Sequence, residues 1–166
     1  MMAPTTPSTS DFRHALGQFA TGVTVVTAAR GPGRVHGMTA NSFTSVSLKP
    51  LLILICVANQ AQLLPLIQKQ KRFGVSILRE DQKELSEYFA QTVEDPEIEI
   101  RLGVRYRWTE TGTPLLGDAL AHLACKVVSE QAAGDHTIFI GEVESLDVHE
   151  GKPLLYLCGK YRSLCT

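Results

Sequence analysis

A chain of 166 residues is long enough to bury one hydrophobic core, and a hydrophobic fraction of 44% excludes wholesale disorder. The formal net charge is -1, so the chain lacks the positive excess that nucleic-acid phosphates demand. No apolar run approaches the ~20 residues of a membrane-spanning helix, and the N-terminus has neither the basic start nor the apolar core of a secretory signal, so we expect a cytoplasmic protein.

The N-terminal part predicts a tail and a helix. Residues 1–9 should form a flexible tail, followed by a single domain over residues 10–166. Ser10 or Asp11 can cap a helix at the start of that domain. Three apolar side chains give this helix one apolar face: Phe12, Leu16 and Phe19.

The next segments predict a hairpin and a buried strand. The β-branched run 23–27 should be a strand, and the turn 30–33 should join it to a partner strand over 35–41. The continuous apolar run 51–57 predicts a strand that is buried on both faces. Leu63 and Ile67 then suggest a short helix.

The middle of the chain mixes a strand, a helix and an irregular segment. Residues 73–78 predict a strand, and Asp81 with Glu84 resembles a capping box for a helix whose apolar stripe holds Leu85 and Phe89. Charges interrupt the segment 94–107, which we expect to be irregular and which could serve as a lid.

The C-terminal part predicts three further strands. Small or apolar residues at alternate positions from 119 to 127 mark one strand face, and strands over 137–148 and 154–159 follow. Many turn-bounded strands with few short helices favour a mainly β protein that forms a closed antiparallel barrel.

Four scattered cysteines contain no Cys-x-x-Cys pair, which argues against a metal site and a disulfide framework. Cys56, Cys125 and Cys158 lie in apolar strand-like runs, so we expect buried thiols without a role in turnover. Cys165, near the C-terminus, should be exposed.

The stretch from Gly37 to Pro50 is crowded with small and hydroxylated residues, unlike a strand edge built only to be buried. Small side chains let a flat ligand approach the backbone, and hydroxyl and amide groups can surround it with donors and acceptors. A Ser/Thr-rich connection that uses its hydroxyls in turns is an equally good interpretation of this composition.

Five segments, in the order of the family, resemble the flavin reductase-like family. They are Phe12–Thr27, Gly37–Pro50, Gly-Asp-His at 134–136, Ile-Gly-Glu-Val at 140–143 and Gly-Lys-Tyr-Arg at 159–162. The similarity extends over nearly the whole chain, from Asp11 to Arg162.

The resemblance implies an antiparallel FMN-binding split β-barrel that is homodimeric. It also implies an NAD(P)H:flavin oxidoreductase that transfers hydride from NADH or NADPH to FMN or FAD and supplies a flavin-dependent monooxygenase. Two alternatives stay open. One is a flavin-binding or flavin-carrying protein without significant NAD(P)H turnover. The other is a pyridoxamine-phosphate-oxidase-like flavoenzyme, which the Gly-Asp-His and Gly-Lys-Tyr-Arg motifs fit less well.

By resemblance, the flavin site is built from three neighbouring segments. The ribityl chain and ring would lie along Thr39, Ala40, Asn41 and Ser42. The pyrimidine side would face Ser45, Val46 and Ser47, whose backbone N–H groups could bind an edge that gains negative charge on reduction. A third segment, beside the flavin, would be Cys56, Val57 and Ala58.

The segment 59–64, Asn-Gln-Ala-Gln-Leu-Leu, departs from the Ser and Thr that relatives carry for the phosphate. Asn59 and Gln62 could replace these donors, and Lys69 or Lys71 could supply positive charge. For either lysine, a solvated helix end is an equally good interpretation.

His136 in Gly-Asp-His is the candidate catalytic residue, because the resemblance places it on the nicotinamide side of the flavin. Tyr161 and Arg162 match a motif near the same cleft, where Arg162 could bind a phosphate of NAD(P)H. Hydride transfer between two cofactors requires neither a nucleophile nor a metal from the protein. The remaining histidines are interpreted as surface or packing residues: His14, His36, His122 and His149.

Overall fold

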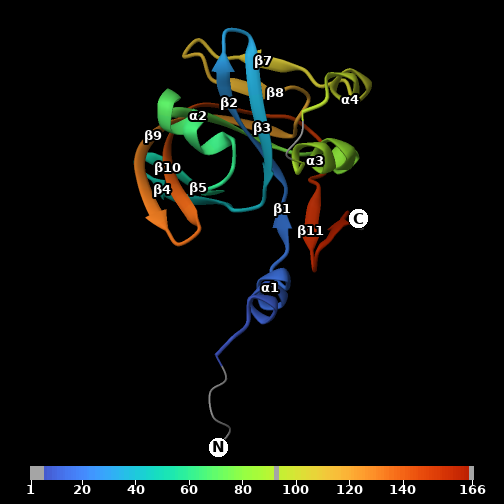
Figure 1. Cartoon of the computed structure of the whole chain (residues 1–166). Coiled ribbons are helices and arrows are strands. Elements are labelled where there is room, and N and C mark those ends of the chain that lie inside the picture. The colour runs from blue at the N-terminus through green and yellow to red at the C-terminus, as the bar shows by residue number, and fades with distance from the viewer. Residues whose placement is uncertain (1–5, 92–93, 165–166) are drawn as a thin grey trace, which may run out of the picture.

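The computed structural model describes residues 6–91 and 94–164. Its centre is one antiparallel sheet in the strand order β3-β2-β6-β9-β10-β5-β4. The strands are β2 (Thr24–Gly31), β3 (Arg34–Ala40), β4 (Phe43–Leu48), β5 (Leu51–Ala58), β6 (Arg72–Ile77), β9 (Ala121–Ala133) and β10 (His136–Val148). The two edge strands, β3 and β4, are consecutive in the chain, so Asn41 and Ser42 connect the opposite edges of the sheet (Figure 1).

One core fills the inside of this curled sheet. Buried side chains of β2, β3, β5, β6, β9 and β10 pack together with helix α2 (Leu63–Gln70), which contributes Leu63 and Ile67. The expected helix and its apolar face are therefore confirmed. The mainly β architecture with few short helices is confirmed as well, because β-branched and aromatic side chains fill a core that all these strands share.

A smaller layer beside the sheet contains the elements that flank the candidate site. A second core joins helix α3 (Lys83–Phe89) to strand β8 (Pro114–Leu116) and to the three-stranded sheet β1-β11-β12. Those three strands are β1 (Thr21–Gly22), β11 (Leu155–Leu157) and β12 (Lys160–Arg162), and β7 (Tyr106–Trp108) pairs with β8.

The N-terminal helix α1 (Thr9–Gly17) begins earlier than expected and projects from the body of the chain (Figure 1). Ser8 is its cap, and Asp11 accepts the Ser8 backbone N–H at 3.1 Å from the third helical position. The predicted cap at Ser10 or Asp11 was wrong, because Asp11 has the acidic role in this capping box. Phe12, Leu16 and Phe19 are 62%, 56% and 75% exposed.

Two other local expectations were wrong. Helix α3 follows a 3-10 turn at Glu80–Gln82, and the cap contact joins the Gln82 side chain to the Arg79 backbone rather than Glu84 to Asp81. The supposedly irregular segment contains α4 (Pro96–Arg101), because the Asp95 carboxylate accepts backbone N–H groups at its start.

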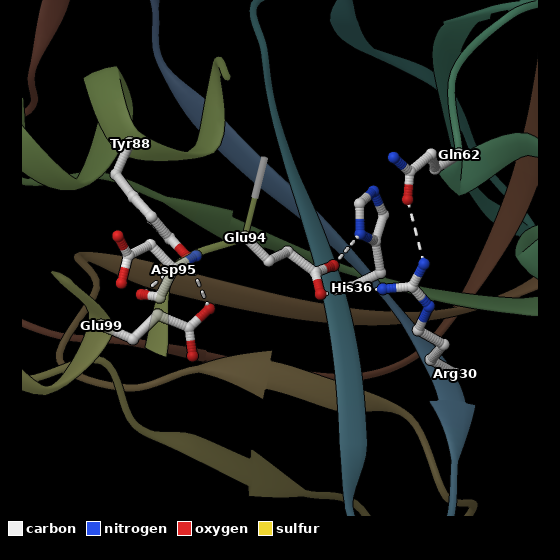
Figure 2. Close-up of polar contacts among 7 residues, drawn as sticks. All are labelled: Arg30, His36, Gln62, Tyr88, Glu94, Asp95 and Glu99. Carbon is white, nitrogen blue, oxygen red and sulfur yellow. Dashed lines mark hydrogen bonds and ion pairs between the residues drawn. The ribbon is translucent and has the colours of Figure 1, made fainter. Parts of the chain in front are cut away.

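The start of this segment is bound to the first hairpin. Figure 2 shows that His36 of β3 and Arg30 of β2 both point toward the carboxylate of Glu94, which forms an ion pair of 2.8 Å with Arg30. On the other side, the Tyr88 hydroxyl of α3 donates to Glu99 of α4 at 3.0 Å. These contacts tie α4 to both the sheet and α3.

Burial of the strands and thiols also differs in part from expectation. In β5 only Ile53, Ile55 and Val57 are buried, and the opposite face is half-buried, because no element of this chain's described residues covers it. Cys125 is buried and Cys56 is intermediate, but Cys158 is exposed. Cys158 and Gly159, at φ 51° and 74°, form the tight turn after β11, which explains this correction. Cys165 lies outside the described residues.

Within the described residues, none of the helices has the length and apolar character needed to cross a membrane.

Candidate active site

A cavity of about 210 Å³ lies where β3 ends, between α3 and the C-terminal strands. It brings together Thr39, Ala40 and Asn41 of the predicted flavin stretch with Tyr161 of the terminal motif. Its remaining lining residues are Val23, Ser86, Ala90 and Tyr156. Small side chains, an exposed amide and two aromatic rings thus converge on one space, as is typical of a site for a flat ligand with a polar edge.

One wall of this cavity is a continuous chain of hydrogen bonds. The Thr39 hydroxyl donates to the Ser86 carbonyl oxygen at 2.7 Å, and the Ser86 hydroxyl lies 2.9 Å from that of Tyr161. Tyr161 packs edge-on against Tyr156, with ring centroids 5.3 Å apart, and the Lys83 ammonium lies 5.7 Å from the Tyr161 ring centroid. Strand β3, helix α3 and strand β12 therefore hold each other in place here.

Gly37 explains how α3 comes so close to β3. A Cβ atom at this position would lie 2.8 Å from the ring of Phe89, which is 5% exposed. A larger residue would push this buried ring and the helix that carries it outward. The close approach places Ser86, three residues before Phe89, beside Thr39.

The linker after the cavity is fixed by its own hydroxyl. Ser42 donates from its side chain to the Cys56 carbonyl oxygen at 2.9 Å, and its carbonyl accepts the Cys56 N–H at 3.2 Å. Asn41, immediately before it, is exposed at the cavity. Ser42 thus anchors the linker to β5, while the amide of Asn41 can reach a ligand.

A second group of predicted residues, His136, Ala58 and Cys56, shares the outward face of β5 and β10. His136 lies directly opposite Ala58, and Cys56 lies opposite Ile138, which was not predicted. All four are partly exposed, whereas Val57 points into the core and offers a ligand only its backbone. His136 Nδ1 lies 2.8 Å from a carboxylate oxygen of Asp135, and this hydrogen bond lowers the pKa of Asp135.

Asn59 supports the turn that carries His136. Its side-chain NH₂ donates to the Gly134 carbonyl at 3.1 Å, and its side-chain oxygen accepts the Thr137 hydroxyl at 2.9 Å. Its backbone N–H donates to the Asp135 carbonyl at 2.9 Å. These polar groups of Asn59 therefore all bind within the chain, and these contacts position the Gly-Asp-His turn.

The other expected phosphate donors lie in separate contacts. The side-chain oxygen of Gln62 accepts from Arg30 at 3.0 Å (Figure 2), and Lys71 forms an ion pair of 3.3 Å with Glu130. Lys69 is exposed in the last turn of α2.

Ser45, Val46 and Ser47 lie along the edge strand β4, beyond the lining of the cavity. A bulge between Ser45 and Ser47 leaves Val46 without a pairing position, and the Ser47 hydroxyl accepts the Lys49 N–H at 3.1 Å. Arg162 is exposed on β12, next to Tyr161. Within this chain these four residues do not join the Thr39–Tyr161 cavity.

A larger cavity, of about 690 Å³, contains none of the predicted residues. Charged side chains of both signs line it, including the Arg79–Asp81 and Arg105–Asp118 ion pairs at 3.0 and 3.6 Å. Paired surface charges are typical of a solvated groove, so the smaller cavity is the better candidate site.

The family model for the flavin reductase like domain matches residues 16–165. An NADH-dependent flavin reductase from Rhodococcus sp. is 46% identical over 154 residues, which cover 92% of this chain and 84% of that protein. The reductase component of 4-hydroxyphenylacetate 3-monooxygenase from Thermus thermophilus is 41% identical, over 92% of this chain and 95% of that protein.

Two solved structures are similar over almost the whole chain. The flavin reductase PheA2 in its native state has a TM-score of 0.87 at 46% identity, covering 96% of this chain and all of that one. The NADH:FAD oxidoreductase SgcE6 of Streptomyces globisporus C-1027, in complex with NAD and FAD fragments, has a TM-score of 0.84 at 38% identity, covering 94% and 92%. The expected split-barrel fold is therefore confirmed.

Proposed function

The chain belongs to the flavin reductase like domain family and is an NAD(P)H:flavin oxidoreductase, and from this premise we propose that NADH is its hydride donor and FAD or FMN its acceptor. The reduced flavin then serves a partner monooxygenase. The observation that carries this proposal is the cavity in which Thr39, Ala40, Asn41 and Tyr161 converge.

The residues present fit a flavin ring. The cavity offers small side chains at Ala40 and Ala90, over which a flat ring can lie close to the backbone, and hydroxyls at Thr39 and Tyr161 along one wall. The flavin, when bound, supplies the electron-accepting ring chemistry. Asn41 at the exposed edge is proposed to bind its polar rim, and the Ser86–Tyr161 contact to keep the wall rigid.

His136 is proposed to position the nicotinamide. It lies on the outward face of β10, half-exposed, and Asn59 and Asp135 restrain the turn before it. A restrained imidazole can donate or accept one hydrogen bond to a carboxamide. The hydride itself needs no side-chain proton donor, so this role is orientation.

We also propose that the protein is a homodimer, with the remaining flavin contacts supplied across the interface. Strand β4 pairs only with β5 among the described residues and so forms a sheet edge, where Val46 and Leu48 of β4 and Leu51 of β5 are 45%, 80% and 48% exposed. An apolar sheet edge favours association unless it is covered. Such a dimer would cover Ser45–Ser47 and the outward face of β5. Sedimentation velocity of wild type and Leu48→Lys tests it: a dimer that Leu48→Lys dissociates is expected, and a monomeric wild type contradicts it.

An anaerobic assay tests the reaction. The protein is mixed with FAD or FMN and with NADH or NADPH, and bleaching of the oxidised flavin band is followed. We expect bleaching with NADH. Flavin that binds but stays oxidised with both nucleotides would instead identify a flavin-carrying protein.

A further inference from the structure

Two histidines and an aspartate meet at the far end of the β9–β10 ribbon. His122 of β9 lies directly opposite Asp147 of β10, and His149 follows two residues later. The ligand atoms of the three side chains all lie within 4.8 Å of one another. None of the three residues lines the Thr39–Tyr161 cavity, and Asp147 lies eleven residues along β10 from His136, so this cluster is separate from both parts of the candidate flavin site.

The hydrogen bond of His122 determines which of its nitrogens is available. The His122 ring is buried, with 2% exposure, and its Nε2 lies 2.6 Å from the Leu116 carbonyl oxygen. A carbonyl oxygen only accepts, so Nε2 carries the proton of the neutral ring. Nδ1 then presents a lone pair, and this buried atom has no hydrogen-bond partner.

The lone pair of His122 faces a carboxylate. Nδ1 of His122 lies 3.2 Å from Asp147 Oδ1, and Nε2 of His149 lies 3.2 Å from Asp147 Oδ2. The neutral His122 ring thus directs a lone pair at a carboxylate oxygen, and a cation between the two atoms would be bound by both. Bonds of ~2.1 Å arranged tetrahedrally around Zn²⁺ separate their donors by about 3.4 Å, close to both spacings.

From this geometry we propose that His122, Asp147 and His149 bind one divalent transition-metal ion of the Zn²⁺ type. Two imidazoles and one carboxylate suit Zn²⁺, Co²⁺, Ni²⁺ or Cu²⁺, whereas Mg²⁺ and Ca²⁺ prefer oxygen ligands throughout. The Leu116 carbonyl orients the His122 ring from its far nitrogen, as outer-shell acceptors do for metal-bound histidines.

The surroundings leave room for a fourth ligand. A cavity of about 250 Å³ opens at His122 and Asp147 and is lined also by Trp108, Thr109 and Ser145. Arg107 donates to Asp147 Oδ1 and is the one competing cation among the described contacts of the cluster. Its side chain is 48% exposed, so it can turn toward solvent and release Asp147 Oδ1 to the ion.

The test is a Zn²⁺ titration by calorimetry of the full-length, untagged protein with its thiols reduced, compared with three variants. His149→Ala and Asp147→Ala remove ligands, and His14→Ala removes an exposed histidine of α1 as a matched control. We expect one Zn²⁺ per chain in wild type and His14→Ala, and at least a ~10- to 100-fold loss of affinity in the two ligand variants. Absence of saturable binding, or equal affinity in His149→Ala, would overturn the site.

Co²⁺ provides a second measurement that separates this cluster from the thiols. Bound to His and Asp ligands, it should give ligand-field bands without the intense charge-transfer absorption of a cobalt–thiolate bond, and His149→Ala should abolish them. Thiolate charge transfer at one equivalent would assign the ion to cysteine and contradict the proposal.

Discussion

The hydroxyl oxygens of Ser86 and Tyr161 lie 2.9 Å apart, and this contact joins strand β12 to helix α3 at the wall of the candidate flavin cavity. The Ser86 carbonyl accepts the Thr39 hydroxyl, so the same residue also holds β3. Three segments that are far apart in sequence thus build one wall. The shape of the cavity depends on Ser86 although Ser86 belongs to none of the motifs.

Removal of either hydroxyl should weaken flavin binding because it loosens this wall. Tyr161→Phe and Ser86→Ala should each lower flavin affinity by about two- to tenfold, the scale of one hydrogen bond of ~0.5–1.5 kcal/mol. The flavin affinity of the double variant should be only slightly lower than that of the single variant that binds flavin less tightly, because both changes break the same contact. Fully additive losses in a fluorescence titration would show that the two residues act separately.

Asn41→Leu should weaken flavin binding by roughly 1–3 kcal/mol, since it removes a hydrogen-bonding group and leaves a ligand atom unpaired. Because Asn41 is exposed, the melting temperature of the Asn41→Leu protein should stay close to that of wild type. Quenching of flavin fluorescence measures the affinity. An unchanged dissociation constant would remove Asn41 from the site.

Asn59→Leu should have the opposite profile. It loses two side-chain hydrogen bonds, to Gly134 and Thr137, so we expect the unfolding free energy to fall by roughly 1–3 kcal/mol. Denaturant unfolding measures this loss. A variant as stable as wild type that binds flavin poorly would instead make Asn59 a direct ligand.

The thiols should differ sharply in reactivity. Burial raises the pKa of Cys125 from 9.0 to about 12, so this thiol should resist alkylation in the folded protein while the exposed Cys158 reacts. Because the folded state holds this proton more tightly than the unfolded chain, the contribution of Cys125 to stability is complete below pH 9.0 and lost as the pH rises toward 12. Mass spectrometry of alkylated peptides tests whether Cys158 is labelled before Cys125. Equal labelling of Cys125 and Cys158 would contradict it.

His136→Ala should lower kcat/KM for NADH about ten- to hundredfold, or ~1.4–2.8 kcal/mol, while flavin affinity stays near that of wild type. Asp135→Ala is the matched control, because it removes the hydrogen bond to His136 and keeps the imidazole. The kcat/KM of this control for NADH should lie between the values of wild type and His136→Ala. A histidine with a purely structural role would instead lower the melting temperature and weaken both ligands together.

Much of the fold was predictable because local patterns and tertiary packing agree. The apolar run at 51–57 forms a strand, although only one of its faces is buried, and the Leu63–Ile67 spacing forms the expected helix. The predictions failed where a single side-chain contact determines where a helix begins. Ser8, which lies outside the predicted helix, caps α1. Asp95 caps α4 in a segment where charged residues interrupt the spacing of the apolar ones, so no helical pattern is apparent in the sequence.

The site was predictable only where motif residues line it. Thr39, Ala40, Asn41 and Tyr161 meet in the cavity, but Ser86 reaches it through the packing of Phe89 on Gly37, which no short-range pattern reveals. Likewise, the side-chain amide of Asn59 is a suitable hydrogen-bond donor to a ligand, and only the fold shows that this amide instead binds the turn before His136.

Anaerobic stopped-flow mixing of the flavin-loaded protein with NADH, and with NADH deuterated on each face of C4, tests hydride transfer most directly. We predict that the oxidised flavin bleaches at a rate that saturates with NADH, and that one of the two deuterated forms slows this step. A flavin that stays oxidised at saturating NADH, or a rate that neither deuterium changes, would contradict direct hydride transfer in this protein.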